Sequence, residues 1–157
     1  CLMFVGPNYG KAHEAALLYT SVFDHSKIDL VVAYEENEAE VKGAVKHLSF
    51  SLSDEKMMAL DSGKVHGFTF TPAISLMVEC QDQDEIDRYW NALSAVPEAE
   101  QCGWLADKYG VSWQIVPREW NNLVRQSDPD KTERLMRAML TMKKLDIARL
   151  REAFEGP

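Results

Sequence analysis

Residues 101–117 read Gln-Cys-Gly-Trp-Leu-Ala-Asp-Lys-Tyr-Gly-Val-Ser-Trp-Gln-Ile-Val-Pro, and this stretch decides the fold prediction. Two runs with strand-like composition, 105–108 and 111–116, lie on either side of a turn that contains Gly110. Such runs around a glycine-containing turn are typical of a β-hairpin. The stretch therefore predicts that this part of the chain ends in paired strands.

The residues before the hairpin complete a larger unit. An apolar run at 72–78 predicts a strand, and Asp82 is a suitable N-cap for a helix with a helically spaced apolar stripe. That helix ends at 95–97, and three short strands are expected at 100–104, 105–108 and 111–116. The order of elements is βαβββ.

The first half of the chain repeats this order. A strand is expected at Cys1–Val5 and a helix at 12–23, and three further strands are expected at 28–34, 44–52 and 57–60. Two similar units, offset by about 70–75 residues, indicate an internal duplication. We expect one α+β domain over 1–157, with module one at about 1–61 and module two at about 70–117.

A helical tail is expected over about 121–156. Asp128 and Asp146 can each cap a helix, and Gly156 can end the second one. The amphipathic helices need an apolar surface to cover, which is either the chain's own sheet or a partner subunit.

Composition excludes several classes of partner. The formal net charge of −8 argues against nucleic acid, because phosphate binding needs a basic surface. No apolar run approaches the roughly 18 residues of a membrane span, so no membrane partner is expected. Three cysteines without CxxC spacing predict reduced thiols in a cytoplasmic protein.

The predicted strands each have a large apolar face and a face of small or polar side chains. The second kind of face carries His47 and Ser49 in one strand, Ser75 and Met77 in another, and Gln114 in the last. A half-solvated sheet would show the same alternation without any function. Small uncharged groups favour the wall of a cavity, with a small ligand that is neutral or weakly charged because no Lys or Arg falls on these faces.

Three segments together resemble PhnB-like proteins, often labelled "3-demethylubiquinone-9 3-methyltransferase domain" proteins. The segment 101–117 resembles their closing hairpin, Phe70–Ser75 their central strand, and Ala138–Ile147 their C-terminal signature. These proteins belong to the vicinal oxygen chelate (glyoxalase/bleomycin-resistance) superfamily. The resemblance implies two βαβββ modules that form a U-shaped mixed sheet around a cup, commonly in a homodimer.

The resemblance also implies where metal ligands would stand. The pattern of the last strand, an Asp and a Gly followed by a Glu, falls on Asp107, Gly110 and Gln114, so that an amide replaces a carboxylate. Ala73 stands at the opening position of module two, and 57–60 offers no strong donor. The opening position of module one lies at or before Cys1. These substitutions predict a protein that binds no metal and no other cofactor.

We therefore expect a cup that binds a small molecule through His47, Ser49, Ser75, Met77, Trp104 and Gln114. Whether the protein is an enzyme, and through which catalytic residues, is left open. One alternative is a metal-dependent glyoxalase or dioxygenase completed by a residue before Cys1 or by a partner subunit. Another is a structural or interaction domain with a filled cup. Methyl transfer is not expected, because no glycine-rich cofactor loop links a strand to a helix.

Overall fold

The computed structural model describes residues 1–125 and 128–156. Residues 126–127 of the predicted 121–156 tail, and residue 157 of the predicted domain, lie outside the described residues. The chain forms two compact units, Cys1–Thr69 and Phe70–Pro157, and each is described by itself.

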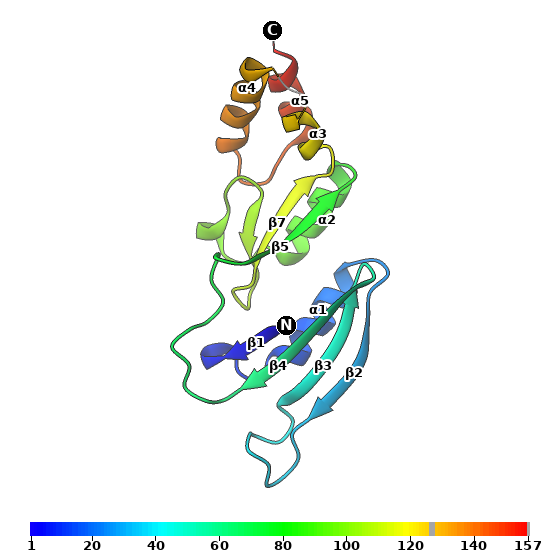
Figure 1. Cartoon of the computed structure of the whole chain (residues 1–157), viewed down its shortest axis with the longest axis vertical. Helices are drawn as coiled ribbons and strands as arrows, with labels where there is room; N and C mark the ends of the chain where they lie inside the picture. The colour runs from blue at the N-terminus through cyan, green and yellow to red at the C-terminus, as the bar shows by residue number, and fades with distance from the viewer. Residues whose placement is uncertain (126–127, 157) are drawn as a thin grey trace. The chain divides into compact units, whose positions relative to one another are not determined.

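The first unit has the predicted βαβββ order (Figure 1). Its sheet has the strand order β1-β4-β3-β2, in which β1 runs parallel to β4 and the other pairs are antiparallel. The elements are β1 (Leu2–Val5), a 3-10 helix η1 (Gly6–Asn8), α1 (Ala12–Val22), β2 (Lys27–Ala33), β3 (Val45–Leu52) and β4 (Glu55–Ser62).

Helix α1 packs against one face of this sheet. Ala15 and Ala16 are buried, and their small side chains allow the helix to approach β3 closely; Leu48 and Phe50 of that strand are also buried. Alternation along β3 places His47 and Ser49 on the opposite face, as the sequence predicts. Leu48 and Phe50 are buried under the helix, whereas His47 and Ser49 on the other face are only partly buried.

A buried carboxylate joins three parts of the first unit. Asp61 of β4 accepts hydrogen bonds from the backbone N–H groups of Gly10 (2.9 Å), Ala12 (3.2 Å) and Val45 (2.8 Å). Buried polar groups are stable only when they are paired in this way. Asp61 thus fixes the start of α1 and the start of β3 to β4.

The second unit has a smaller sheet, with the strand order β5-β7-β6 (Figure 1). Strand β5 runs parallel to β7, and β6 runs antiparallel to β7. The elements before the tail are β5 (Ser75–Cys80), α2 (Gln83–Leu93), a 3-10 helix η2 (Pro97–Ala99), β6 (Trp104–Ala106) and β7 (Ser112–Pro117). Asp82 caps α2 as predicted, and its side chain accepts from the N–H of Glu85 at 2.9 Å.

The predicted strand at 100–104 is wrong. Cys102 (φ 53°) and Gly103 (φ 83°) both have left-handed backbone conformations, which reverse the chain and prevent an extended strand. Only an isolated bridge between Gln101 and Trp104 remains, so the described part of the second unit is βαββ. In addition, β5 begins at Ser75 instead of at residue 72, and Ile74 is 81% exposed.

The helical tail consists of α3 (Trp120–Arg125), α4 (Pro129–Leu140) and α5 (Ile147–Glu155). The side chains of Asp128 and Asp146 cap α4 and α5, and Gly156 (φ 77°) follows α5, all as predicted. The tail packs within its own unit, in a core formed by Leu135, Met142, Leu145 and Leu150 together with Val116, Trp120 and other partly buried apolar side chains.

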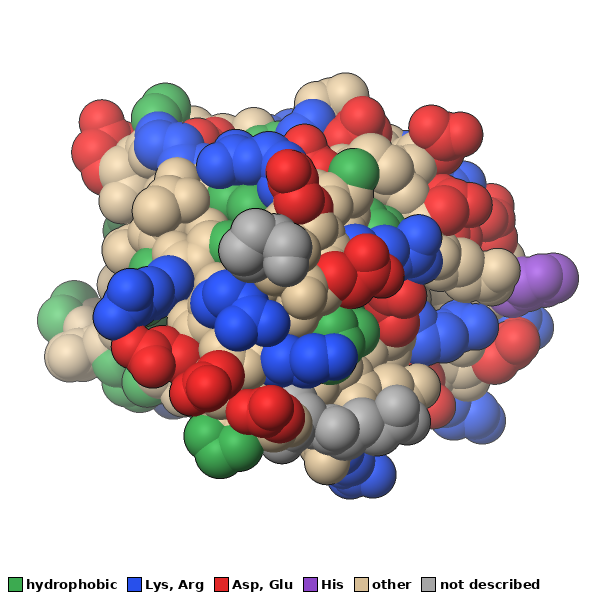
Figure 2. Space-filling model, turned by 90° about the horizontal axis from the view of Figure 1, so that it is seen from above, with side chains coloured by type: hydrophobic (Ala, Val, Ile, Leu, Met, Phe, Trp, Pro, Cys, Tyr) green, Lys and Arg blue, Asp and Glu red, His purple; other side chains and the backbone are tan. Residues whose placement is uncertain are grey.

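The end of the second unit that carries the C-terminal helices faces the viewer in Figure 2. Figure 2 shows acidic and basic side chains intermixed on this face. Among the described helices, none is both long enough and apolar enough to cross a membrane.

Candidate ligand-binding site

Three of the predicted site residues form a row across the sheet of the second unit. Gln114 of β7 pairs in register with Met77 of β5 on one side and with Trp104 of β6 on the other. Side chains of directly paired residues lie on the same face of a sheet. The face opposite α2 therefore carries an amide between a thioether and an indole.

A hydrogen bond holds the central amide of this row. The Gln114 Nε2 group donates to the Ser75 hydroxyl at 2.8 Å, across β7 and β5. Both side chains are partly buried. Since the nitrogen is held by Ser75, the Oε1 atom of Gln114 is the acceptor that this amide can offer to a ligand.

A pocket of about 320 Å³ lies beside this row. Three lining residues come from the predicted set, and the others come from the ends of β5 and β7, the loop before β6, and the helical tail. The described lining residues are Met77, Glu79, Cys102, Trp104, Gln114, Val116, Pro117, Trp120, Asn121, Met136, Met139 and Leu145. Its walls are thus mainly apolar, with a few polar groups, as in most small-molecule sites.

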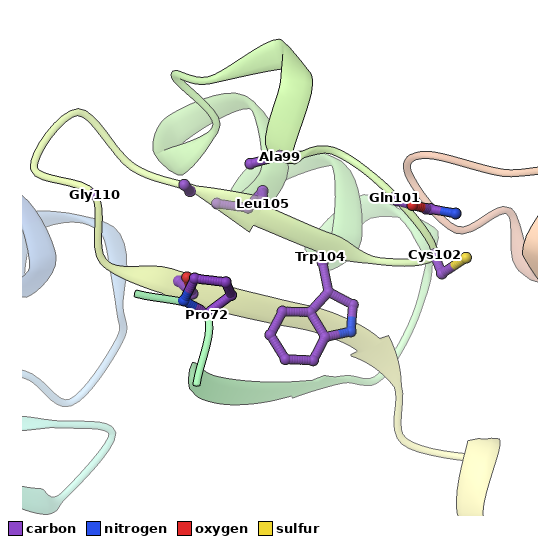
Figure 3. A pocket seen from close by; sticks show the side chains of 9 residues that line it. Pro72, Ala99, Gln101, Cys102, Trp104, Leu105 and Gly110 are labelled. Atoms are coloured by element: carbon purple, nitrogen blue, oxygen red, sulfur yellow. The ribbon is translucent and has the colours of Figure 1, made fainter. Parts of the chain in front are cut away.

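A second pocket of about 440 Å³ shares Cys102 and Trp104 with the first. Figure 3 shows the indole of Trp104 extending from β6, with Pro72 on one side and Cys102 on the other. Trp104 therefore borders both pockets, so its side-chain position affects the width of each.

The structure brings four predicted residues together: Ser75, Met77, Trp104 and Gln114. His47 and Ser49 lie on β3 of the first unit, on the sheet face away from α1, and both are partly buried. Their part in the same site stays a prediction.

Sequence reasoning missed the contribution of the tail. Trp120, Met136, Met139 and Leu145 line the pocket, although the tail was expected only to cover an apolar surface. Glu79 was also missed, because the strand was predicted to end at Val78. Continuing the alternation of Ser75 and Met77 by one step would have placed Glu79 on the same face.

The hairpin motif before Gln114 has a structural role. Asp107 is buried and accepts hydrogen bonds from the N–H groups of Tyr109 (2.9 Å) and Val111 (3.0 Å) and from Nε1 of Trp113 (2.9 Å). Gly110 has a φ of 82°, which glycine adopts readily. The two residues thus shape the turn and place Gln114 at the centre of β7.

The side chains at the expected metal positions do not fit a divalent ion. Ala73 has no donor atom, and the 57–60 segment of β4 offers only thioether and aliphatic side chains. Gln114 offers one neutral amide oxygen where the family pattern has a carboxylate. Among residues 1–125 and 128–156, no three His, Cys, Asp or Glu side chains are grouped so that they could hold a metal ion. Zinc sites need three or four N, O or S donors, so this donor set is too poor for one.

Of the three thiols, Cys80 is fully buried and Cys102 partly buried, whereas Cys1 is exposed. Burial raises the pKa of the Cys80 thiol to about 12. Cys80 is therefore an inert core residue.

Comparison with known proteins finds one matching family and a solved structure with the same description. The family described as 3-demethylubiquinone-9 3-methyltransferase matches residues 1–116. A solved PhnB protein from Bacillus cereus, also described as a 3-demethylubiquinone-9 3-methyltransferase, is 40% identical, with a TM-score of 0.64 over 74% of this chain and 96% of that one. No protein of curated function matches significantly.

Two more distant structures share the fold alone. Protein PA1353 from Pseudomonas aeruginosa is 19% identical, with a TM-score of 0.57 over 74% of this chain and 92% of that one. The fosfomycin resistance protein FosX from Mesorhizobium loti is 11% identical, with a TM-score of 0.50 over 80% and 94%. The match over residues 1–116 and the close PhnB relative show that the chain belongs to the PhnB-like family of the glyoxalase/bleomycin-resistance superfamily.

Proposed function

We propose that this PhnB-like protein binds a small molecule, without a metal ion, in the pocket beside Gln114. The observation that carries the proposal is the row Met77–Gln114–Trp104, in which one oriented amide faces a largely apolar pocket of about 320 Å³. Apolar walls with a few convergent polar groups are the usual composition of a small-molecule site.

The exposure of the pocket residues favours binding over a filled, purely structural cup. Met77 remains 58% exposed although it lies in the middle of a strand, and Gln114 is only partly buried. A side chain that filled a core would be buried, as Trp113 and Ile115 are on the other face of β7.

The donor chemistry favours binding without a metal. Ala73 and the amide of Gln114 replace groups that could act as strong ligands, so we derive no metal-dependent step. We also infer no methyl transfer, although the family description names a methyltransferase. Gly103 and Gly110 belong to turns around β6, and neither forms a loop that leads from a strand into a helix around a nucleoside.

A ligand screen tests the proposal. The protein, labelled with ¹³C at its methionine methyl groups, is titrated with a library of small neutral and charged compounds. We expect some compounds to shift the signals of Met77, Met136 or Met139 and to raise the melting temperature.

A matched pair of variants makes the screen specific. Gln114→Leu keeps the size of the side chain and removes the amide, so we expect the affinity of a pocket ligand to fall. Gln81→Leu changes an exposed glutamine that does not line the pocket and should leave binding unchanged. Ligands that bind Gln114→Leu as tightly as the unchanged protein would contradict the role of this site.

Replacing His47 or Ser49 by Ala, and measuring the affinity of the same ligands, tests the predicted contribution of the first unit.

The metal-dependent alternative has a direct test. The complete protein is purified without chelator, and its metal content is measured by mass spectrometry before and after incubation with Zn²⁺ or Mn²⁺. Stoichiometric metal would favour the alternative.

We also propose that the protein forms a homodimer. The mass of the protein in solution should then be twice the 17.8 kDa of this chain.

A further inference from the structure

We infer that the ligand of the pocket beside Gln114 is a small organic cation, an amine or a quaternary ammonium group attached to an apolar body. This inference rests on the proposed binding function and adds the class of ligand. It departs from the expectation of a neutral or weakly charged ligand, because that expectation did not include Glu79.

The charge of the lining points to a cation. Glu79 is the one formally charged side chain among the described lining residues, which include no Lys, Arg or His. Asn121 donates a hydrogen bond from Nδ2 to Glu79 Oε1 at 3.3 Å. This contact holds the carboxylate on the pocket wall and adds no positive charge. An anionic ligand would meet a like charge there, whereas a cation would meet an opposite one.

The walls favour the same ligand. Two indoles, those of Trp104 and Trp120, line the pocket, and the face of an indole attracts cations. Three thioethers, from Met77, Met136 and Met139, add polarisable surface that packs well against methyl and aromatic groups. A carboxylate combined with aromatic and thioether walls is chemistry suited to an alkylammonium group.

The amide of Gln114 also suits a cationic ligand. The Oε1 atom of Gln114 is a neutral acceptor, which a ligand with an ammonium or other N–H donor can use. The net charge of −8 on the whole chain also increases the local concentration of cations. A neutral apolar ligand of the same shape would use the walls and leave the Glu79 carboxylate without a counter-charge.

Matched probes test the inference. The ¹³C-methionine protein is titrated with (4-hydroxybenzyl)trimethylammonium, with its neutral isostere 4-neopentylphenol, and with the anion 4-hydroxyphenylacetate. We expect the cation to bind at least about fivefold more tightly than the neutral isostere, with shifts at Met77, Met136 or Met139, and the anion to bind most weakly. Added NaCl should weaken binding of the cation and leave that of the neutral compound unchanged.

Variants locate the effect. Glu79→Gln keeps the shape of the side chain and removes its charge, so the affinity of the cation should fall about three- to fivefold while that of the neutral isostere stays the same. Glu98→Gln is the control, because Glu98 is an exposed carboxylate of η2 that does not line the pocket. It should leave both affinities unchanged.

The outcomes separate the two proposals. Equal binding of the cation and the neutral isostere, with no effect of Glu79→Gln, would overturn the inference and leave the proposed binding function intact. If no probe shifts a methionine signal, the inference also fails, and the library screen described above decides the binding function by itself.

Discussion

The amide nitrogen of Gln114 donates a 2.8 Å hydrogen bond to the hydroxyl of Ser75 on the neighbouring parallel strand. Ser75 is thus the group that orients the central polar side chain of the pocket. In this arrangement the hydroxyl accepts from the amide nitrogen, which leaves the oxygen of Gln114 available to a ligand.

Replacing Ser75 by Ala should therefore weaken ligand binding more than it weakens the fold. We expect the dissociation constant of a pocket ligand to rise about two- to tenfold, because a typical hydrogen bond contributes about 0.5–1.5 kcal/mol. Calorimetric titration measures the change. Ser21→Ala, at an exposed position of α1, is the control. An unchanged affinity in Ser75→Ala would show that the orientation of Gln114 does not matter for binding.

Gly103→Ala should destabilise the second unit. A Cβ atom at this position would lie 2.9 Å from the carbonyl oxygen of Ile115 and 3.0 Å from Leu145, and the backbone φ is +83°. We expect the free energy of unfolding to fall by about 2–4 kcal/mol, from left-handed strain and the steric clash together.

Gly10→Ala provides the matched control for that variant. Gly10 has the same φ of +83°, but no atom lies within 4 Å of the Cβ position. This variant carries the backbone strain alone, which is about 1–2 kcal/mol. Urea unfolding of both variants gives the loss in the free energy of unfolding for each, and the difference between the two losses is the contribution of the clash. Equal losses would show that Leu145 and Ile115 do not constrain this turn.

Asp107→Asn should also be destabilising, because the buried carboxylate accepts from two backbone N–H groups and from the indole of Trp113. An amide replaces one of the acceptor oxygens by a donor, and we expect a loss of about 2–4 kcal/mol. Denaturant unfolding monitored by tryptophan fluorescence measures it. Asp54→Asn, at an exposed turn with a φ of 67°, should change stability by less than about 0.5 kcal/mol. A similar small change in Asp107→Asn would show that the hairpin does not depend on this carboxylate.

Cys80 should resist alkylation in the native protein. Burial raises the pKa of its thiol from 9.0 to about 12, and the residue has no exposed surface. At pH 8 only about one thiol in 10⁴ would be ionised, and the thiolate is the reactive form. A short pulse of iodoacetamide, read by mass spectrometry, should modify the exposed Cys1 and spare Cys80 until urea is added. Labelling of Cys80 at the rate of Cys1 would contradict the buried position.

The same thiol has a consequence for stability at high pH. Its pKa is higher in the folded than in the unfolded chain, so the unfolded chain loses the proton first as the pH rises. The contribution of the neutral thiol is therefore complete below about pH 9 and is lost as the pH rises toward 12. Cys80→Ala should flatten this part of the stability profile.

Much of the local structure could be read from the sequence, because short-range rules decide it. Asp82, Asp128 and Asp146 each cap the helix that their position predicted. The alternation of small and apolar residues also placed Ser75, Met77 and Gln114 on one face correctly.

Two features depend on contacts that no local pattern contains. The composition of 100–104 is compatible with a strand, but Cys102 has a left-handed conformation that is uncommon for a residue other than glycine. Met136 and Met139 belong to the pocket only because the tail packs back against the sheet, whose last strand ends at Pro117. Helical spacing could show that these methionines share a face of α4, but not what that face covers.

The reversal at Cys102 and Gly103 also changes which groups accept hydrogen bonds from the backbone of the second unit. The two N–H groups donate to the carbonyl oxygens of Met142 and Lys143, each at 2.8 Å. The C-terminal segment thus does what a neighbouring strand does elsewhere in a sheet. Shortening the chain before Met142 would leave both donors without these acceptors. The tail therefore supplies backbone acceptors to the second unit as well as apolar side chains, so the fold of this unit depends on it.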